Sequence, residues 1–80
     1  MEKEDYMRRA LELAEEAAKN DEVPIGAVVV DSQTGKITAE ARNQSAHNGD
    51  ATSHAEILAI QRACKALGQP RLWNMDMYVT

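Results

Sequence analysis

Ile25-Gly26-Ala27-Val28-Val29-Val30 is the stretch that decides the fold. It is a short apolar run rich in β-branched residues, and it follows Pro24, which has no backbone N–H to donate to a ladder. An uninterrupted apolar run of this length predicts a strand that is buried on both faces. Gly26 inside the strand indicates a close approach by another backbone or by a ligand, and we expect packing against a helix.

The segments on either side predict a helix before this strand and a hairpin after it. Between about Asp5 and Asn20, small and apolar residues recur at helical spacing, with charged residues on the other side. The recurring residues are Tyr6, Ala10, Leu13, Ala14 and Ala17. Residues 31–35 have turn chemistry, and residues 36–41 alternate polar with apolar side chains, which predicts a β-hairpin with a half-exposed second strand.

The second half of the chain predicts a loop, a helix and a third strand. Residues 42–52 contain almost no large apolar side chain and are expected to form a surface loop. A helix is predicted from about Ser53 to Leu67, ended by Gly68, and the alternation in residues 75–79 predicts a strand. The residues expected to form the buried stripe of this helix are Ile57, Ile60, Cys64 and Leu67.

Composition excludes several classes of protein. A net charge of -4 argues against a surface built mainly to hold phosphate backbones. The single cysteine, Cys64, rules out an internal disulfide framework and is compatible with a reducing compartment. No apolar run approaches the roughly 20 residues of a membrane helix. We therefore expect a cytoplasmic protein that does not enter a membrane.

The residues Ser53-His54-Ala55-Glu56 combine a metal ligand with a proton carrier where the second helix is predicted to start. In an open first turn both side chains lean back past the helix end, whose partial positive charge favours a carboxylate or a metal-bound hydroxide. The same spacing is also that of a capping box, in which Ser53 and Glu56 satisfy backbone donors, and on this pattern alone capping is the commoner outcome. Cys64 lies about 15 Å further along the helix axis and cannot share a metal with His54.

The segments Glu22-Val23-Pro24-Ile25-Gly26-Ala27-Val28 and Ser53-His54-Ala55-Glu56-Ile57, together with Asn43, resemble the zinc-dependent cytidine deaminase superfamily. Within it the chain is most similar to the bacterial tRNA-specific adenosine deaminases. The resemblance runs from about Tyr6 to Thr80 and stops where the P-C-x-x-C motif of that superfamily should begin.

The resemblance implies a cytidine deaminase-like α/β fold, a three-layer α/β/α sandwich around a mixed sheet. Residues 1–80 would then be the N-terminal part of a single deaminase domain that lacks its P-C-x-x-C segment. His54 would bind the one Zn²⁺ of the complete domain, and Glu56 would carry protons without binding the metal. Asn43, Val23 and Ala55 match positions that line the base pocket.

The implied reaction is hydrolytic deamination of adenosine to inosine at the wobble position of tRNA anticodon loops, carried out by a homodimer. Because one histidine does not hold a catalytic zinc, the chain by itself is expected to be inactive. A guanine, cytosine or deoxycytidylate deaminase is one alternative, and a non-catalytic structural or interaction unit is another. Three strands alone are also expected to leave an exposed edge and an uncovered face.

Overall fold

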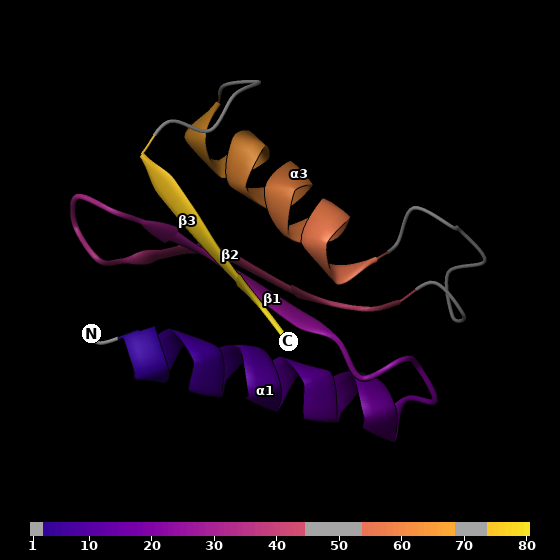
Figure 1. Ribbon diagram of the computed structural model, residues 1–80. Coiled ribbons are helices and arrows are strands. Elements are labelled where there is room, and N and C mark those ends of the chain that lie inside the picture. The colour runs from indigo at the N-terminus through magenta and orange to yellow at the C-terminus, as the bar shows by residue number, and fades with distance from the viewer. Residues whose placement is uncertain (1–2, 45–53, 69–73) are drawn as a thin grey trace.

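The computed structural model describes residues 3–44, 54–68 and 74–80. Their elements occur in the predicted order of helix, strand, strand, helix and strand (Figure 1). The elements are α1 (Lys3–Lys19), β1 (Gly26–Asp31), β2 (Ile37–Arg42), α3 (Ala55–Leu67) and β3 (Met75–Val79). No helix in these ranges is long and apolar enough to cross a membrane.

The three described strands form one sheet in the order β2-β1-β3. β1 pairs antiparallel with β2, from Gly26↔Arg42 onward, and antiparallel with β3, from Ala27↔Val79 onward. Its first five residues are buried, which confirms the prediction of a strand covered on both faces. The parallel strands of the expected mixed sheet are not among the strands in the described ranges.

One helix covers each face of the sheet, so the described elements form three layers (Figure 1). Alternate residues of β1 point to opposite faces, and two separate cores result. The core under α1 consists of Tyr6, Ala10, Leu13, Val28 and Val30. The core under α3 consists of Ala27, Val29, Ala39, Ala41, Ala55, Ala59 and Ala63. This arrangement confirms the predicted sandwich, and the predicted inner face of α1 is buried.

The connection between β1 and β2 is the predicted hairpin turn. The Asp31 carboxylate accepts hydrogen bonds from the backbone N–H groups of Gln33 and Thr34, at 2.9 and 3.3 Å. Gly35 has a φ of 76°, a left-handed conformation that glycine adopts without steric cost. The Tyr6 hydroxyl donates to the carbonyl oxygen of Gly35 at 2.6 Å, so α1 also holds the turn in place.

The buried face of α3 differs from the sequence prediction. The predicted stripe is largely exposed: Ile57 is 39 %, Ile60 40 % and Leu67 40 % exposed, and Cys64 is half-buried rather than a core residue. The fully buried residues are instead Ala55, Ala59 and Ala63, which lie four residues apart on one face. Their small side chains allow the helix backbone to approach β1 and β2 closely. α3 therefore packs on the sheet through its alanines.

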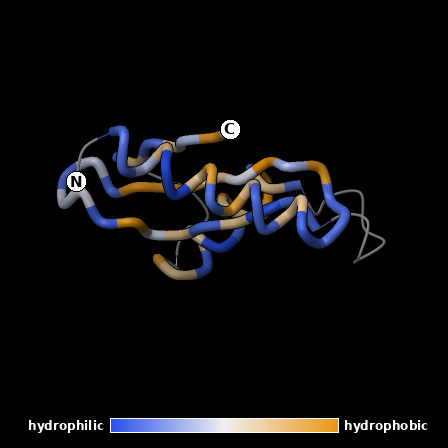
Figure 2. The backbone as a smooth tube through the Cα atoms, turned by 90° about the horizontal axis from the view of Figure 1, so that it is seen from below, coloured by the Kyte–Doolittle hydropathy of each residue, from blue (hydrophilic) through white to orange (hydrophobic). Residues whose placement is uncertain are grey.

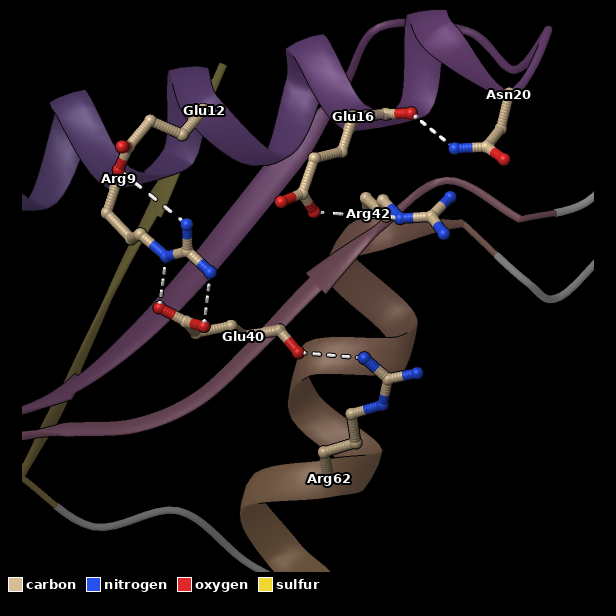
Figure 3. Close-up of polar contacts among 7 residues, drawn as sticks. All are labelled: Arg9, Glu12, Glu16, Asn20, Glu40, Arg42 and Arg62. Carbon is tan, nitrogen blue, oxygen red and sulfur yellow. Dashed lines mark hydrogen bonds and ion pairs between the residues drawn. The ribbon is translucent and has the colours of Figure 1, made fainter.

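Arginine side chains attach β2 to both helices (Figure 3). Arg9 on α1 donates from Nε and Nη2 to the two carboxylate oxygens of Glu40, at 2.7 and 3.0 Å. Arg62 on α3 donates from Nη1 to the backbone oxygen of Glu40 at 2.9 Å. Arg42 lies 3.9 Å from a carboxylate oxygen of Glu16 on α1. The outer strand β2 is therefore fixed from above and below.

Candidate active site

The candidate residues come from chain segments that meet at one end of the sheet. β1 begins at this end, β2 ends there, and Asn43 follows β2 directly. The end of β3 is there too, because the N–H of Thr80 donates to the oxygen of Gly26 and the N–H of Gly26 donates to Oγ1 of Thr80, both at 3.1 Å. α3 begins at the same end, where a hydrogen bond joins Ala55 to Asn43.

His54 is the N-cap residue of α3 and is exposed. Its backbone is extended (φ -83°, ψ 145°), and its oxygen accepts the first helical hydrogen bond, from Leu58 at 2.9 Å. The side chain of His54 makes no capping hydrogen bond. The imidazole is therefore not used by the helix end and is accessible to a ligand.

Glu56 lies in the first turn of α3 and is half-buried. The partial positive charge of the helix N-terminus stabilises a carboxylate at this position. The predicted capping box needed Ser53 as its first member, and Ser53 lies outside the described residues. The helix begins at Ala55, slightly later than the sequence suggested.

Asn43 connects β2 to the start of α3. It is 1 % exposed, and its Oδ1 accepts a hydrogen bond of 2.7 Å from the backbone N–H of Ala55. Its own N–H donates to the oxygen of Ile25 at 3.2 Å, which extends the β1–β2 ladder by one pair. From its sequence position, Asn43 could present its amide to a ligand or cap its own turn. The described contact is neither. Asn43 supplies a cap to a helix that starts 12 residues later.

Two of the expected pocket residues are therefore in direct contact, and the third lies further out. Ala55 is fully buried beneath the start of α3, whereas Val23 is 58 % exposed. The N–H of Ile25 donates to the oxygen of Val23 at 2.8 Å, so the chain bends tightly around Pro24. The oxygen of Ile25 accepts from the N–H of Asn43, so three hydrogen bonds separate Val23 from Ala55 at the start of α3.

Thr80 belongs to this end of the sheet, although no sequence pattern assigns it a role. Its hydroxyl oxygen accepts a hydrogen bond from the N–H of Gly26, the first residue of β1. No local sequence motif predicts this contact, because the two residues are 54 positions apart. Only the pairing of β3 with β1 reveals it. Polypeptide attached at Thr80 would start beside the candidate residues.

The described residues of this chain do not form a zinc site by themselves. His54 is an accessible imidazole and fits as one ligand, but in the described ranges no three histidine, cysteine, aspartate or glutamate side chains are close enough to share a metal. Catalytic zinc sites use three protein ligands. At least two more must come from elsewhere before zinc could bind as it does in a catalytic site.

The fold is that of the cytidine deaminase-like proteins. A solved structure from a study of A-to-I editing by tRNA:A34 deaminases is 46 % identical and superimposes with a TM-score of 0.93, covering 100 % of this chain and 60 % of that one. Guanine deaminase from Bacillus subtilis is 39 % identical, with a TM-score of 0.92 over 99 % of this chain and 50 % of that one.

The profile of the MafB19-like deaminase family matches residues 1–80, and the chain belongs to this family. The tRNA-specific adenosine deaminase of Agrobacterium fabrum is 47 % identical over 79 residues, which are 99 % of this chain and 51 % of that protein. The chain thus spans about half the length of this relative. The family and fold predicted from the sequence are confirmed.

Proposed function

We propose that this chain is part of a zinc-dependent nucleobase deaminase that converts adenosine to inosine at the wobble position of tRNA. The observation that carries the proposal is the placement of His54 and Glu56 on the first turn of α3, with Asn43 hydrogen-bonded to the residue between them. The relatives named tRNA-specific adenosine deaminase support the choice of substrate. Residues 1–80 are then one part of a single deaminase domain.

In this proposal each residue has the role of its counterpart in the zinc deaminases. His54 would bind the metal, and the Glu56 carboxylate would carry two protons in succession from the attacking water, the first to a ring nitrogen and the second to the amino group, which then leaves as ammonia. Asn43 and Ala55 lie against one edge of the base, and Val23 contacts it from the exposed side. The place of Glu56 in the first turn of α3, one residue after Ala55 and two after His54, supports its role as the proton carrier.

The remaining zinc ligands, two cysteines by resemblance, lie in polypeptide that residues 1–80 do not include. The position of Thr80 beside Gly26 supports this assignment, since polypeptide joined there would begin at the candidate site. Without it we expect residues 1–80 to release no ammonia from tRNA. The complete enzyme is proposed to be a cytoplasmic homodimer that binds the tRNA anticodon loop.

The test is to join residues 1–80 to the part of the Agrobacterium fabrum relative that lies beyond the matched region, and to measure ammonia release from tRNA with adenosine at the wobble position. We expect activity and about one zinc per chain, which His54→Ala removes. Glu56→Gln should retain zinc but lower the rate by about 10²-fold or more. Glu15→Gln, on the exposed face of α1, is the matched control and should leave the rate unchanged.

Ammonia release by residues 1–80 alone would contradict the proposal, and so would full activity of the Glu56→Gln variant. Zinc content that is unaffected by His54→Ala would instead support a non-catalytic role for this segment.

Guanine deamination is a second candidate, because the structure of guanine deaminase from Bacillus subtilis superimposes almost as well as the tRNA deaminase structure. The joined protein should be assayed with free guanine beside tRNA. Release of ammonia from guanine but not from tRNA would favour this second candidate.

A further inference from the structure

The start of α3 depends on a residue from another part of the chain. The first N–H groups of a helix have no partner within the helix and are usually satisfied by the N-cap side chain. The N-cap residue here, His54, makes no such bond. The N–H of Ala55, the first residue of α3, is satisfied instead by Oδ1 of Asn43.

The acceptor atom, Oδ1 of Asn43, belongs to a residue that is held in place by the sheet. Asn43 is almost fully buried, and its backbone is part of the β1–β2 ladder through its bond to Ile25. At 2.7 Å the bond to Ala55 is short for an N–H···O contact. Because the partner is a backbone donor, the asparagine oxygen must face it, which assigns the amide orientation.

The donor lies between the two residues that carry the proposed chemistry. Ala55 has His54 on one side and Glu56 on the other, and its own side chain is fully buried in the core under α3. A shift of this single peptide group would move both neighbours at once. The buried methyl group of Ala55 limits how far the first turn of α3 can move from the sheet. The hydrogen bond that the Ala55 N–H donates to Asn43 limits how the peptide group can rotate.

We propose that Asn43 is a positioning residue that holds His54 and Glu56 through the backbone of Ala55. The role of the two positioned side chains rests on the proposed function. Asn43 links the β1–β2 hairpin to the start of α3, so the position of the hairpin fixes the position of this helix end. In the described residues the N-cap His54 gives the helix no side-chain cap. This role is separate from any contact that Asn43 makes to a base.

The proposal is tested on the full 80-residue chain, without metal or substrate, by amide hydrogen exchange and by NMR of the His54 ring. In the unsubstituted protein the Ala55 amide should exchange at least about tenfold more slowly than in an unstructured peptide, which is unusual for a first helical residue. Asn43→Ala should remove this protection and shift the His54 ring and Glu56 backbone resonances. Asn43→Asp, which keeps an oxygen at the same place, should restore both.

Asn20→Ala is the matched control, because Asn20 donates to the oxygen of Glu16 at the C-terminal end of α1, on the face of the sheet opposite to α3 (Figure 1). It should leave the exchange of Ala55 and the His54 resonances unchanged. Exchange of the Val28 and Val29 amides reports whether each variant keeps the sheet.

Three results would overturn the proposal. The first is an unprotected Ala55 amide in the unsubstituted protein, a result that needs no variant to fold. The second is an Asn43→Asp variant that behaves like Asn43→Ala. The third is loss of Ala55 protection with no change at His54, which would make Asn43 a merely structural cap. Since none of these readouts involves deamination, a failure here is distinct from failure of the proposed reaction.

Discussion

Among single residues, Gly26 determines how closely α1 lies against the sheet. A Cβ atom at this position would overlap the carbonyl oxygen of Ala10 and lie 2.7 Å from Cβ of Leu13 and 2.9 Å from the nitrogen of Ala14. Two of these atoms belong to the helix backbone, which cannot turn aside as a flexible side chain can. The expectation that Gly26 serves packing is therefore supported, with α1 as the approaching backbone.

We expect Gly26→Ala to lower the free energy of unfolding by about 3 kcal/mol or more, because α1 must move away from β1. Gly68→Ala is the comparison, since Gly68 has a φ of 68° but nothing lies within 4 Å of the place that a Cβ would take. The cost there is backbone strain alone, about 1 kcal/mol. Urea denaturation followed by circular dichroism measures both. Equal losses would show that α1 is free to shift.

Arg9 stabilises the fold through the geometry of its hydrogen bonds as well as through its charge. The hydrogen bond to Glu40 is the main cause that raises the pKa of Arg9, while partial burial acts in the opposite direction. Because the pKa is higher in the folded state, Arg9 stabilises the fold at every pH below its pKa in the unfolded chain. This stabilisation is lost only as the pH rises through its pKa in the folded protein. For an arginine this window lies far above neutral pH, so no pH dependence from Arg9 is expected in ordinary buffers.

Arg9→Lys should destabilise the protein by about 1 kcal/mol, since an ammonium cannot bond both oxygens of Glu40 in the planar fork geometry. Arg8→Lys provides the control on the next residue. Arg8 lies 3.6 Å from Asp5 with its side chain 74 % exposed, and an exposed pair of this kind contributes little. Thermal unfolding of the two variants should differ. An Arg9→Lys variant as stable as Arg8→Lys would mean that charge alone matters at Arg9.

Among the elements, α3 gives the clearest test of packing by small residues. Ala59 is fully buried against the sheet, whereas Ile60 is 40 % exposed. We expect Ala59→Leu to cost about 1–3 kcal/mol by overpacking and Ile60→Ala to change stability by less than about 1 kcal/mol. Chemical denaturation decides between this and the reverse order, which the hydrophobic periodicity of the helix would predict.

The elements that the sequence predicts well are those in which hydrophobicity and burial coincide. In α1 and β1 the apolar side chains are the buried ones, so periodicity alone locates both. In α3 the two disagree, because the fully buried residues that pack with Ala27 and Ala41 are alanines, while Ile57 and Ile60 are exposed. Hydrophobicity patterns contain no term for the distance between layers, and the inner face of α3 was therefore predicted wrongly.

The sequence likewise predicts one part of the candidate site and misses another. His54 and Glu56 are close neighbours in sequence, so their motif could be read directly. The bond from Asn43 to Ala55 crosses 12 residues and depends on where the hairpin ends relative to α3, which no local pattern encodes. The assignment of His54 and Glu56 to chemistry stays a prediction, and so does that of Asn43, Val23 and Ala55 to a base pocket.

At the scale of the whole molecule, the sheet in the described ranges has two outer strands whose edges differ. At β2, the ladder register makes the carbonyl of Glu40 point away from β1, and Arg62 covers it. Charged side chains at a strand edge discourage pairing with another chain. At β3, nothing in the described ranges pairs with the outer edge, and hydrophobic residues lie close to the C-terminus in Figure 2. Of the two outer edges in the described sheet, that of β3 is the open one.

Exposed apolar side chains adjoin this open edge. Met77 and Val79 pair with Val29 and Ala27, so they lie on the same face as α3, yet they are 41 % and 37 % exposed. Ile60 and Leu67 on α3 are exposed as well, at 40 % each. Met77 and Val79 form the β3-side apolar patch, where the described sheet has the uncovered face that was expected.

We expect residues 1–80 to self-associate through β3, because an open edge next to an apolar patch favours strand pairing between copies. Met77→Lys places a charge in the middle of this edge and should weaken association by about tenfold or more, since burying an unpaired charge is costly. Leu11→Lys is the matched control, because Leu11 is 54 % exposed on α1, away from the patch. Sedimentation equilibrium over a range of concentrations measures both variants. If Leu11→Lys weakens association as much as Met77→Lys, net charge rather than the β3 edge controls it, and a chain that stays monomeric at all concentrations excludes pairing through β3 altogether.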